Sequence, residues 1–238
     1  MRSLLVAVLL VAACNSTPST PKPTSGAPAP SAPVPPTPPP APVGGTTIAL
    51  VYSGWEIWIG NDDVTPADDP VHYPGALKAL KAGLDQADLA HTLPAGSQGL
   101  VITYTNKAVI RVPLGPVANL TSAALGTQKD YVDTKGSELV AGIQLAIDQL
   151  EKAQTSKKQL IVLSDGNDTN NEAAKPALAL LKKRAAGLGI SVDSIVYKSA
   201  LSNDPNITTS LTAQSTTANS ADLIAQALVH AIQHPGGS

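Results

Sequence analysis

The fold of this chain is constrained most strongly by short apolar runs that alternate with longer segments of helical periodicity. Residues 48–52, 160–164 and 191–197 are rich in apolar and β-branched side chains, which predicts buried strands. Apolar residues at helical spacing predict helices that open at Pro74, follow Gly136, pass through Leu178 and Leu181, and cover residues 221–232. The first two helices carry Leu77, Leu80, Leu84 and Ala87, and Leu139, Val140, Ile143, Ile147 and Leu150.

A hairpin adds one antiparallel pair to this alternating pattern. Residues 99–105 and 108–112 are β-rich and are joined through Asn106 and Lys107. A further short strand is expected near Ser215. The element order predicts an α/β fold with a doubly wound, mainly parallel sheet, helices on both faces and one antiparallel edge strand. In such sheets ligands bind beyond the carboxyl ends of the strands.

The N-terminal residues have the character of a targeting signal. Residues 1–13 combine one arginine with a short apolar core, and small residues stand directly before Cys14, the only cysteine. This pattern resembles the lipobox of bacterial lipoproteins, which implies cleavage before Cys14 and its acylation. The alternative is an ordinary secretory signal with a stray cysteine. With Asn15 rather than aspartate after Cys14, the resemblance favours the outer membrane over the inner one.

The composition changes twice along the chain. Residues 14–45 hold twelve of the 21 prolines, which predicts an extended stalk reaching roughly 90 Å, at about 3.1 Å per residue. Residues 46–234 are long enough for one domain with a substantial core. The formal net charge is −2, and the short cluster Lys182–Arg184 suits the last turn of a helix, so no nucleic-acid partner is expected.

Two polar positions stand where a functional site is expected. Asp165 follows a predicted central strand, and Ser137 precedes a predicted helix. The segments KGSELVAGIQLAIDQL (135–150) and QLIVLSDGNDTN (159–170), with the element order, resemble the von Willebrand factor type A domain over residues 46–232. The resemblance implies a protein-binding domain whose ligand is held through Mg²⁺ or Mn²⁺ at a metal-ion-dependent adhesion site.

Carried over by position, the resemblance assigns Ser53, Ser137 and Asp165 as metal ligands. The first loop departs from the family pattern, because Val51 or Tyr52 stands where the family has an aspartate. A site with one carboxylate holds a divalent ion weakly, so a degenerate site is expected, with weak or lost metal binding. Three acidic residues offer auxiliary ligands: Glu56, Asp62 and Asp63.

Each of these candidates has a structural alternative. Asp165-Gly166 is also ordinary turn chemistry, and Ser137 can serve as a helix N-cap. Thr169 and Glu172 have the spacing of a capping box, but Pro176 would then interrupt the helix.

The two tryptophans, Trp55 and Trp58, are expected either to anchor a partner or to fill the core. We therefore expect a lipid-anchored, non-enzymatic protein-binding domain of the bacterial cell envelope, with no nucleic-acid ligand. The alternatives are a metal-independent structural or assembly role and, less favoured, a metal-assisted hydrolase using Asp165 and Asp168.

Overall fold

The computed structural model describes residues 43–54, 74–127, 136–197, 206–218 and 220–236. Its strands are β1 (Val43–Ser53), β2 (Gln98–Tyr104), β3 (Ala108–Pro116), β4 (Thr155–Ser164), β5 (Ile190–Tyr197) and β6 (Ser215–Ala218). Its α-helices are α2 (Pro74–Ala87), α3 (Leu89–Thr92), α4 (Leu139–Lys152), α5 (Asn171–Gly187) and α6 (Ala221–Gln233). Short 3₁₀ helices are η1 (Val117–Asn119), η2 (Ala123–Leu125) and η4 (Ile207–Ser210). No helix in this part of the chain is both long and apolar enough to span a bilayer.

The six strands form one sheet in the order β3-β2-β1-β4-β5-β6. All neighbouring pairs are parallel except β2 and β3, which form the predicted antiparallel hairpin at one edge. Chain order reverses at β1, where β2 pairs on one side and β4 on the other. The predicted doubly wound sheet is therefore confirmed, with the switch in strand order at β1.

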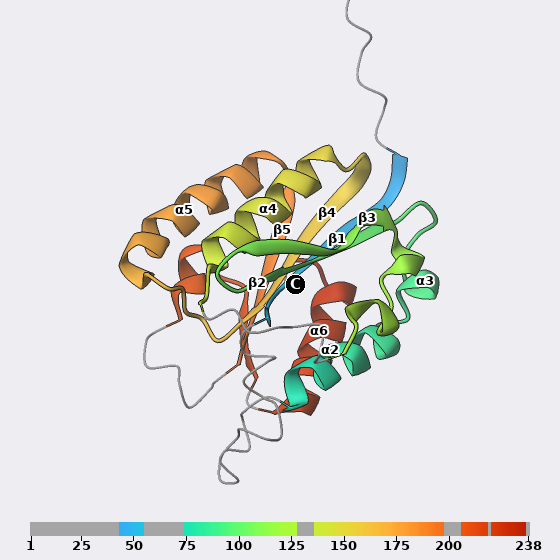
Figure 1. Cartoon of the computed structure of the whole chain (residues 1–238). Helices are drawn as coiled ribbons and strands as arrows, with labels where there is room; N and C mark the ends of the chain where they lie inside the picture. Colours follow the sequence, from blue (N-terminus) through green and yellow to red (C-terminus); the bar gives the residue numbers. More distant parts are fainter. Residues whose placement is uncertain (1–42, 55–73, 128–135, 198–205, 219, 237–238) are drawn as a thin grey trace, which may run out of the picture. The chain divides into compact units, whose positions relative to one another are not determined.

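Helices cover both faces of this sheet, as Figure 1 shows, with α4 and α5 on one face and α2 and α6 on the other. The strand residues alternate between the two layers with a period of two. In β1, Ile48, Leu50 and Tyr52 pack towards α2 and α6, whereas Ala49 and Val51 pack towards α4. Because both faces are buried, the central strands are nearly continuous in apolar residues, which explains why they were recognisable from the sequence.

Helix α5 corrects two of the sequence interpretations. Asn170, not Thr169, is its N-cap, and the Asn170 side chain accepts a hydrogen bond from the backbone N–H of Ala173. Pro176 lies inside the helix without ending it. Pro176 is exposed, so the carbonyl that loses its partner can be hydrated, which limits the cost of the missing N–H.

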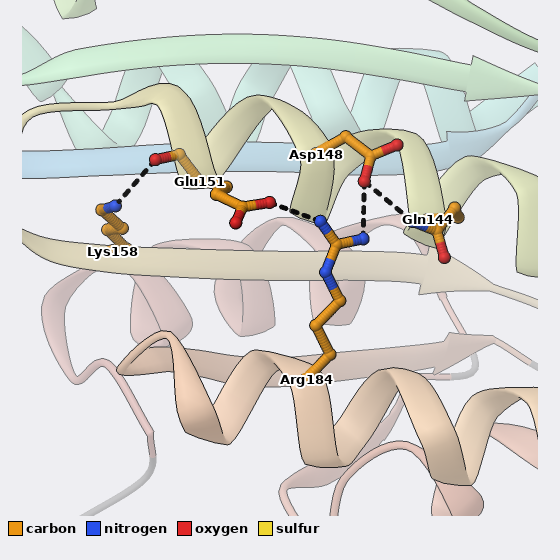
Figure 2. Close-up of polar contacts among 5 residues, drawn as sticks. All are labelled: Gln144, Asp148, Glu151, Lys158 and Arg184. Atoms are coloured by element: carbon orange, nitrogen blue, oxygen red, sulfur yellow. Dashed lines mark hydrogen bonds and ion pairs between the residues drawn. The ribbon is translucent and has the colours of Figure 1, made fainter.

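The basic cluster at the end of α5 places Arg184 in the last helical turn, as predicted, and Arg184 also has a specific role. The Arg184 guanidinium reaches across to α4, where Nη1 lies 2.6 Å from Asp148 Oδ1 and Nη2 pairs with Glu151. Figure 2 shows this arrangement, with Gln144 donating to the same Asp148 carboxylate at 2.8 Å. The hydrogen bond to Asp148, then that to Glu151, raise the pKa of Arg184 above its ordinary value. Arg184 therefore joins two helices, beyond the general preference of a cation for a helix C-terminus.

Candidate functional site

The carboxyl ends of β1, β2 and β4 lie side by side at one edge of the sheet, which we call the rim. Ser53 is the last residue of β1 and pairs in register with Tyr104, the last residue of β2. On its other side, Tyr52 pairs with Leu163, so that the ends of β1 and β4 are also adjacent. The side chain of Ser53 is buried, with 1% of its surface exposed. The loop after β4 and the loop after β2 therefore begin on opposite sides of Ser53.

Asp165 forms a turn directly after β4. Its Oδ1 accepts a hydrogen bond from the backbone N–H of Asn167 at 3.0 Å, and its Oδ2 accepts one from Asn167 Nδ2 at 2.9 Å. This is the side-chain-to-backbone bond by which aspartate closes a turn two residues on. The next residue, Gly166, has φ +89°, and a Cβ there would lie 3.0 Å from the Asn206 Cα. Asp165 and Gly166 therefore form a turn, which was one of the two roles predicted for Asp165. Only glycine fits at position 166.

Ser137 lies against the same loop, from the segment that precedes α4. Its hydroxyl donates to the Asn167 carbonyl at 3.1 Å. Its backbone exchanges two hydrogen bonds with Thr169: the Ser137 N–H donates to Thr169 Oγ1 at 3.0 Å, and the Thr169 N–H donates to the Ser137 carbonyl at 2.7 Å. Ser137 and Asp165 are thus joined through Asn167, which contacts both.

Asp168 completes the attachment of this loop to α4. Its Oδ2 accepts a hydrogen bond from the backbone N–H of Val140 at 3.1 Å, in the first turn of the helix. Glu138 occupies the N-cap position of α4 but makes no side-chain capping bond there. The interpretation of Ser137 as the N-cap is therefore wrong. The cap is a carboxylate from a loop about thirty residues away in the sequence.

Two further segments meet the rim. The Glu138 N–H donates to the Thr105 carbonyl, just beyond β2, at 2.7 Å, and the Ile207 N–H donates to the Gly166 carbonyl at 2.9 Å. Four stretches that are distant in sequence therefore lie together here: the end of the β2 strand, the start of α4, the loop after β4 and the start of η4. Main-chain hydrogen bonds between them make the rim a connected surface.

This arrangement of elements matches solved structures. The vWF domain of the type V pili tip protein Mfa5 from Porphyromonas gingivalis is similar with a TM-score of 0.57 and 10% identity, over 82% of this chain and 95% of that one. A von Willebrand factor type A structure from Catenulispora acidiphila is similar with a TM-score of 0.56 and 15% identity, over 82% and 43% of the two chains. The chain has the von Willebrand factor type A fold.

The PilB minor pilin from Streptococcus sanguinis shares this fold, with a TM-score of 0.60, 11% identity, and coverage of 83% of this chain and 62% of that one. The chain therefore spans nearly all of the Mfa5 domain but less than two thirds of the PilB and Catenulispora structures. No family model and no curated protein sequence matches the chain.

The side-chain oxygens described at the rim of this type A fold are all hydrogen-bonded within the protein, which bears on whether they could hold Mg²⁺ or Mn²⁺. Such an ion takes about six oxygens in near-octahedral array. Both Asp165 oxygens accept from Asn167, Asp168 accepts from Val140, and the Ser137 hydroxyl donates to a carbonyl. Among the described residues, no three acidic, histidine or cysteine side chains are grouped to hold a metal ion.

Several predicted site residues lie outside the described part of the chain. These are the lipidation residue Cys14, the aromatic pair Trp55 and Trp58, and the auxiliary acidic residues Glu56, Asp62 and Asp63. Their assignments stay predictions.

Sequence reasoning missed the residues that assemble the rim, namely Asn167, Thr169 and the capping role of Asp168. A signal for them was present, because residues 165–171 (DGNDTNN) contain only side chains that bond readily to nearby backbone, apart from one glycine. That signal predicts turns, but it does not identify Ser137 and Val140 as the partners, since these belong to another segment. The partners follow only from the sheet topology.

Proposed function

We propose that this chain is a non-enzymatic protein-binding domain of the bacterial cell envelope, with a role in adhesion or in the assembly of a surface structure. The proposal is supported by the fold, since the type A structures similar to it include the tip protein of a type V pilus and a minor pilin. We further propose that acylated Cys14 tethers the domain to the membrane, with the outer membrane as the favoured site. The proline-rich residues 15–42 then hold the domain away from the surface, since residues 43–45 of the predicted stalk belong to β1 instead.

The observation that carries the proposal is the convergence of four chain segments at the rim. Bonds at 2.7 to 3.1 Å join residues 105, 137–140, 166–169 and 207. Exposed polar side chains stand beside these joints, including Asn106 and Lys107 at the hairpin turn and Thr169 and Asn170 after β4. Because binding surfaces work best when their backbone is fixed beforehand, a partner can dock here without first ordering the loops.

We propose that this binding needs no resident metal ion. The carboxylates of Asp165 and Asp168 are engaged by main-chain and side-chain N–H groups, so a divalent ion would have to displace bonds that hold the loops together. The same engagement argues against a hydrolase built on these two residues. A weak Mg²⁺ or Mn²⁺ site involving Ser53, Ser137 and Asp165 is the competing version, and metal titration separates the two.

Site-specific crosslinking tests the proposed surface on the full lipidated chain in native envelope vesicles. One photoreactive side chain is placed at Lys107, at the rim. The other is placed at Ala118 in η1, near the opposite end of β2, where Gln98 pairs with Pro116. Both positions are exposed. We expect a discrete protein adduct from Lys107, equally abundant with and without a chelator, and none from Ala118. Equal adducts from both positions, or none from either, would remove the rim as the binding surface.

The lipid anchor is tested independently of the rim. Cys14→Ser removes the acylated thiol, so the chain is expected to leave the membrane fraction while its melting temperature stays unchanged. Retention of the variant in a washed outer-membrane fraction would contradict the tether but would leave the protein-binding proposal standing.

A further inference from the structure

A pocket of about 140 Å³ lies away from the rim, between the β5–β6 edge of the sheet and α6. It is lined by Asp193, Ser194 and Ile195 of β5, by residues 213–216, and by Ala227, His230 and Ala231 of α6. Val196 of β5 pairs with Ser164, the last residue of β4, and so marks the level of the rim. Asp193 lies three residues earlier in β5, which places the pocket about 10 Å from the rim along the strand. It belongs to no part of the site described above.

One of the residues that line this pocket, Asp193, carries a buried carboxylate. Asp193 is only 7% exposed, and its Oδ2 accepts from Gln159 Nε2 at 2.9 Å and from the Gly236 N–H at 3.3 Å. None of the described residues donates to Oδ1, and no described lysine or arginine forms an ion pair with Asp193. Asp193 is one of the residues that line the pocket, and Oδ1 is its oxygen without a hydrogen bond to the described residues.

A second unsatisfied acceptor stands beside this carboxylate. Gln159 is fully buried, and its Nε2 donates to Asp193 Oδ2 and to the Ala231 carbonyl at 2.6 Å. This fixes the orientation of the amide, because the reversed amide would place its oxygen against two acceptors. Gln159 Oε1 is left as a buried oxygen without a hydrogen bond in the described structure. Buried acceptors of this kind are uncommon, but Gln159 is not one of the residues that line the pocket, so its role is to hold the Asp193 carboxylate in place.

The surroundings favour a positive charge over a negative or neutral group. The Ala231 carbonyl lies in the last turn of α6, where the helix dipole presents its negative end. The lining is mixed: Ile195, Ala227 and Ala231 are apolar, Ser194, Thr216 and His230 are polar, and Gln214 and Ser215 are polar and exposed. A buried carboxylate together with these three apolar side chains suits a cationic head on a short aliphatic stem.

We propose that this pocket binds an alkylammonium group, with Asp193 Oδ1 as its counter-ion and Ile195, Ala227 and Ala231 against the alkyl chain. An ammonium ion carries N–H donors that can pair with a single carboxylate, whereas a metal ion needs more ligands than one carboxylate. A cavity of roughly 150 Å³ accepts a molecule the size of benzene, so the volume is sufficient for a short alkyl amine. The ammonium comes either from a free small amine or from a lysine side chain of a partner.

Three variants test the proposal on the full chain. Asp193→Asn removes the charge but keeps an oxygen acceptor for Gln159 and Gly236. Ala227→Leu fills the pocket and leaves the carboxylate in place, and Gln226→Leu, at the neighbouring exposed position of α6, is its matched control. Binding is followed by calorimetry and by amide chemical shifts of residues 193–195 and 213–216.

The probes are n-butylammonium, the neutral alcohol 1-butanol, and a short peptide with one lysine or one acetylated lysine. We expect saturable binding of butylammonium or of the lysine peptide, and none of butanol or the acetylated peptide. Affinity should fall roughly tenfold or more in Asp193→Asn and in Ala227→Leu, and stay unchanged in Gln226→Leu. The tighter of the two cationic probes identifies the source of the ammonium.

Three results would overturn the proposal: no saturable binding of either cation, equal binding of butanol, or equal affinity in Ala227→Leu and Gln226→Leu. If Asp193→Asn fails to fold, the α6 pair still decides the question, because both leucines keep Asp193.

Discussion

The carboxylate of Asp168, in the loop after β4, accepts a hydrogen bond at 3.1 Å from the backbone N–H of Val140 in the first turn of α4. The negative charge stands at the positive end of the helix dipole, and its other oxygen accepts from the Asn170 N–H at 3.1 Å. One side chain therefore orders its own loop and caps a helix from another segment. The rim depends on this bond, because it fixes the loop after β4 against α4.

Asp168→Ala should lower the free energy of unfolding by about 1 to 2 kcal/mol, because a helix N-terminus loses its cap. Chemical denaturation of the full chain measures the change. Asp85→Ala, an exposed position in the last turn of α2, is the control and should change stability by no more than about 0.5 kcal/mol. Equal effects of the two substitutions would show that the Asp168 bond contributes nothing.

Removal of the Ser137 hydroxyl should have a smaller effect that is specific to the loop after β4. Ser137→Ala loses one hydrogen bond to the Asn167 carbonyl, worth about 1 kcal/mol, whereas Ser137→Thr keeps a hydroxyl. Hydrogen exchange of the amides of residues 167–169 should speed up in the alanine variant only. Exchange rates equal to those of the parent protein in both variants would show that the hydrogen bond from Ser137 to the Asn167 carbonyl does not stabilise this loop.

Arg184 should stabilise the packing of α5 on α4 through charge. Arg184→Gln removes the pairs with Asp148 and Glu151, so the melting temperature should fall, and the fall should shrink at high salt because the groups are partly exposed. Lys183→Gln changes the same net charge at the neighbouring exposed position and should have less effect. A salt-independent difference would point to lost packing instead.

His91 provides a test by pH. Its Nδ1 lies 2.8 Å from Asp88 Oδ1, and that hydrogen bond, followed by the attraction of the two charges, raises the pKa of His91. With the folded pKa above the unfolded one, the stabilisation is complete below the ordinary value of about 6.5 and is lost as pH rises through the folded pKa. An NMR titration should show a lower His91 pKa in Asp88→Asn. An unchanged pKa would contradict the contact.

Much of the fold was predictable because its signals are local. The run 160–164 and the spacing of Leu77, Leu80 and Leu84 reflect burial on both faces of a strand and on one face of a helix. The Asn106-Lys107 turn placed the antiparallel edge correctly. Local signals failed at Pro176, where tertiary packing of Ala174 and Leu178 keeps the helix continuous across the proline.

The candidate site was predictable only in outline. That Ser137 lies close to the Asp165 loop follows from sheet topology, and the structure bears out this proximity through Asn167. The partners of Asp168 and Thr169 were not predictable, because a hydrogen bond between residues some thirty positions apart leaves no periodic trace. Nor does the sequence distinguish a carboxylate that binds metal from one that accepts backbone N–H groups, since the same residue type serves both.

A Mn²⁺ titration followed by electron paramagnetic resonance tests the central claim most directly, namely that the rim carboxylates hold the loops together and bind no resident metal. The full chain and its Asp165→Ala variant would be titrated in parallel, with hydrogen exchange of residues 166–171 recorded on both. We predict no saturable Mn²⁺ binding by either protein, and faster exchange in the variant because its turn is lost. Stoichiometric Mn²⁺ binding that disappears in Asp165→Ala would contradict the account.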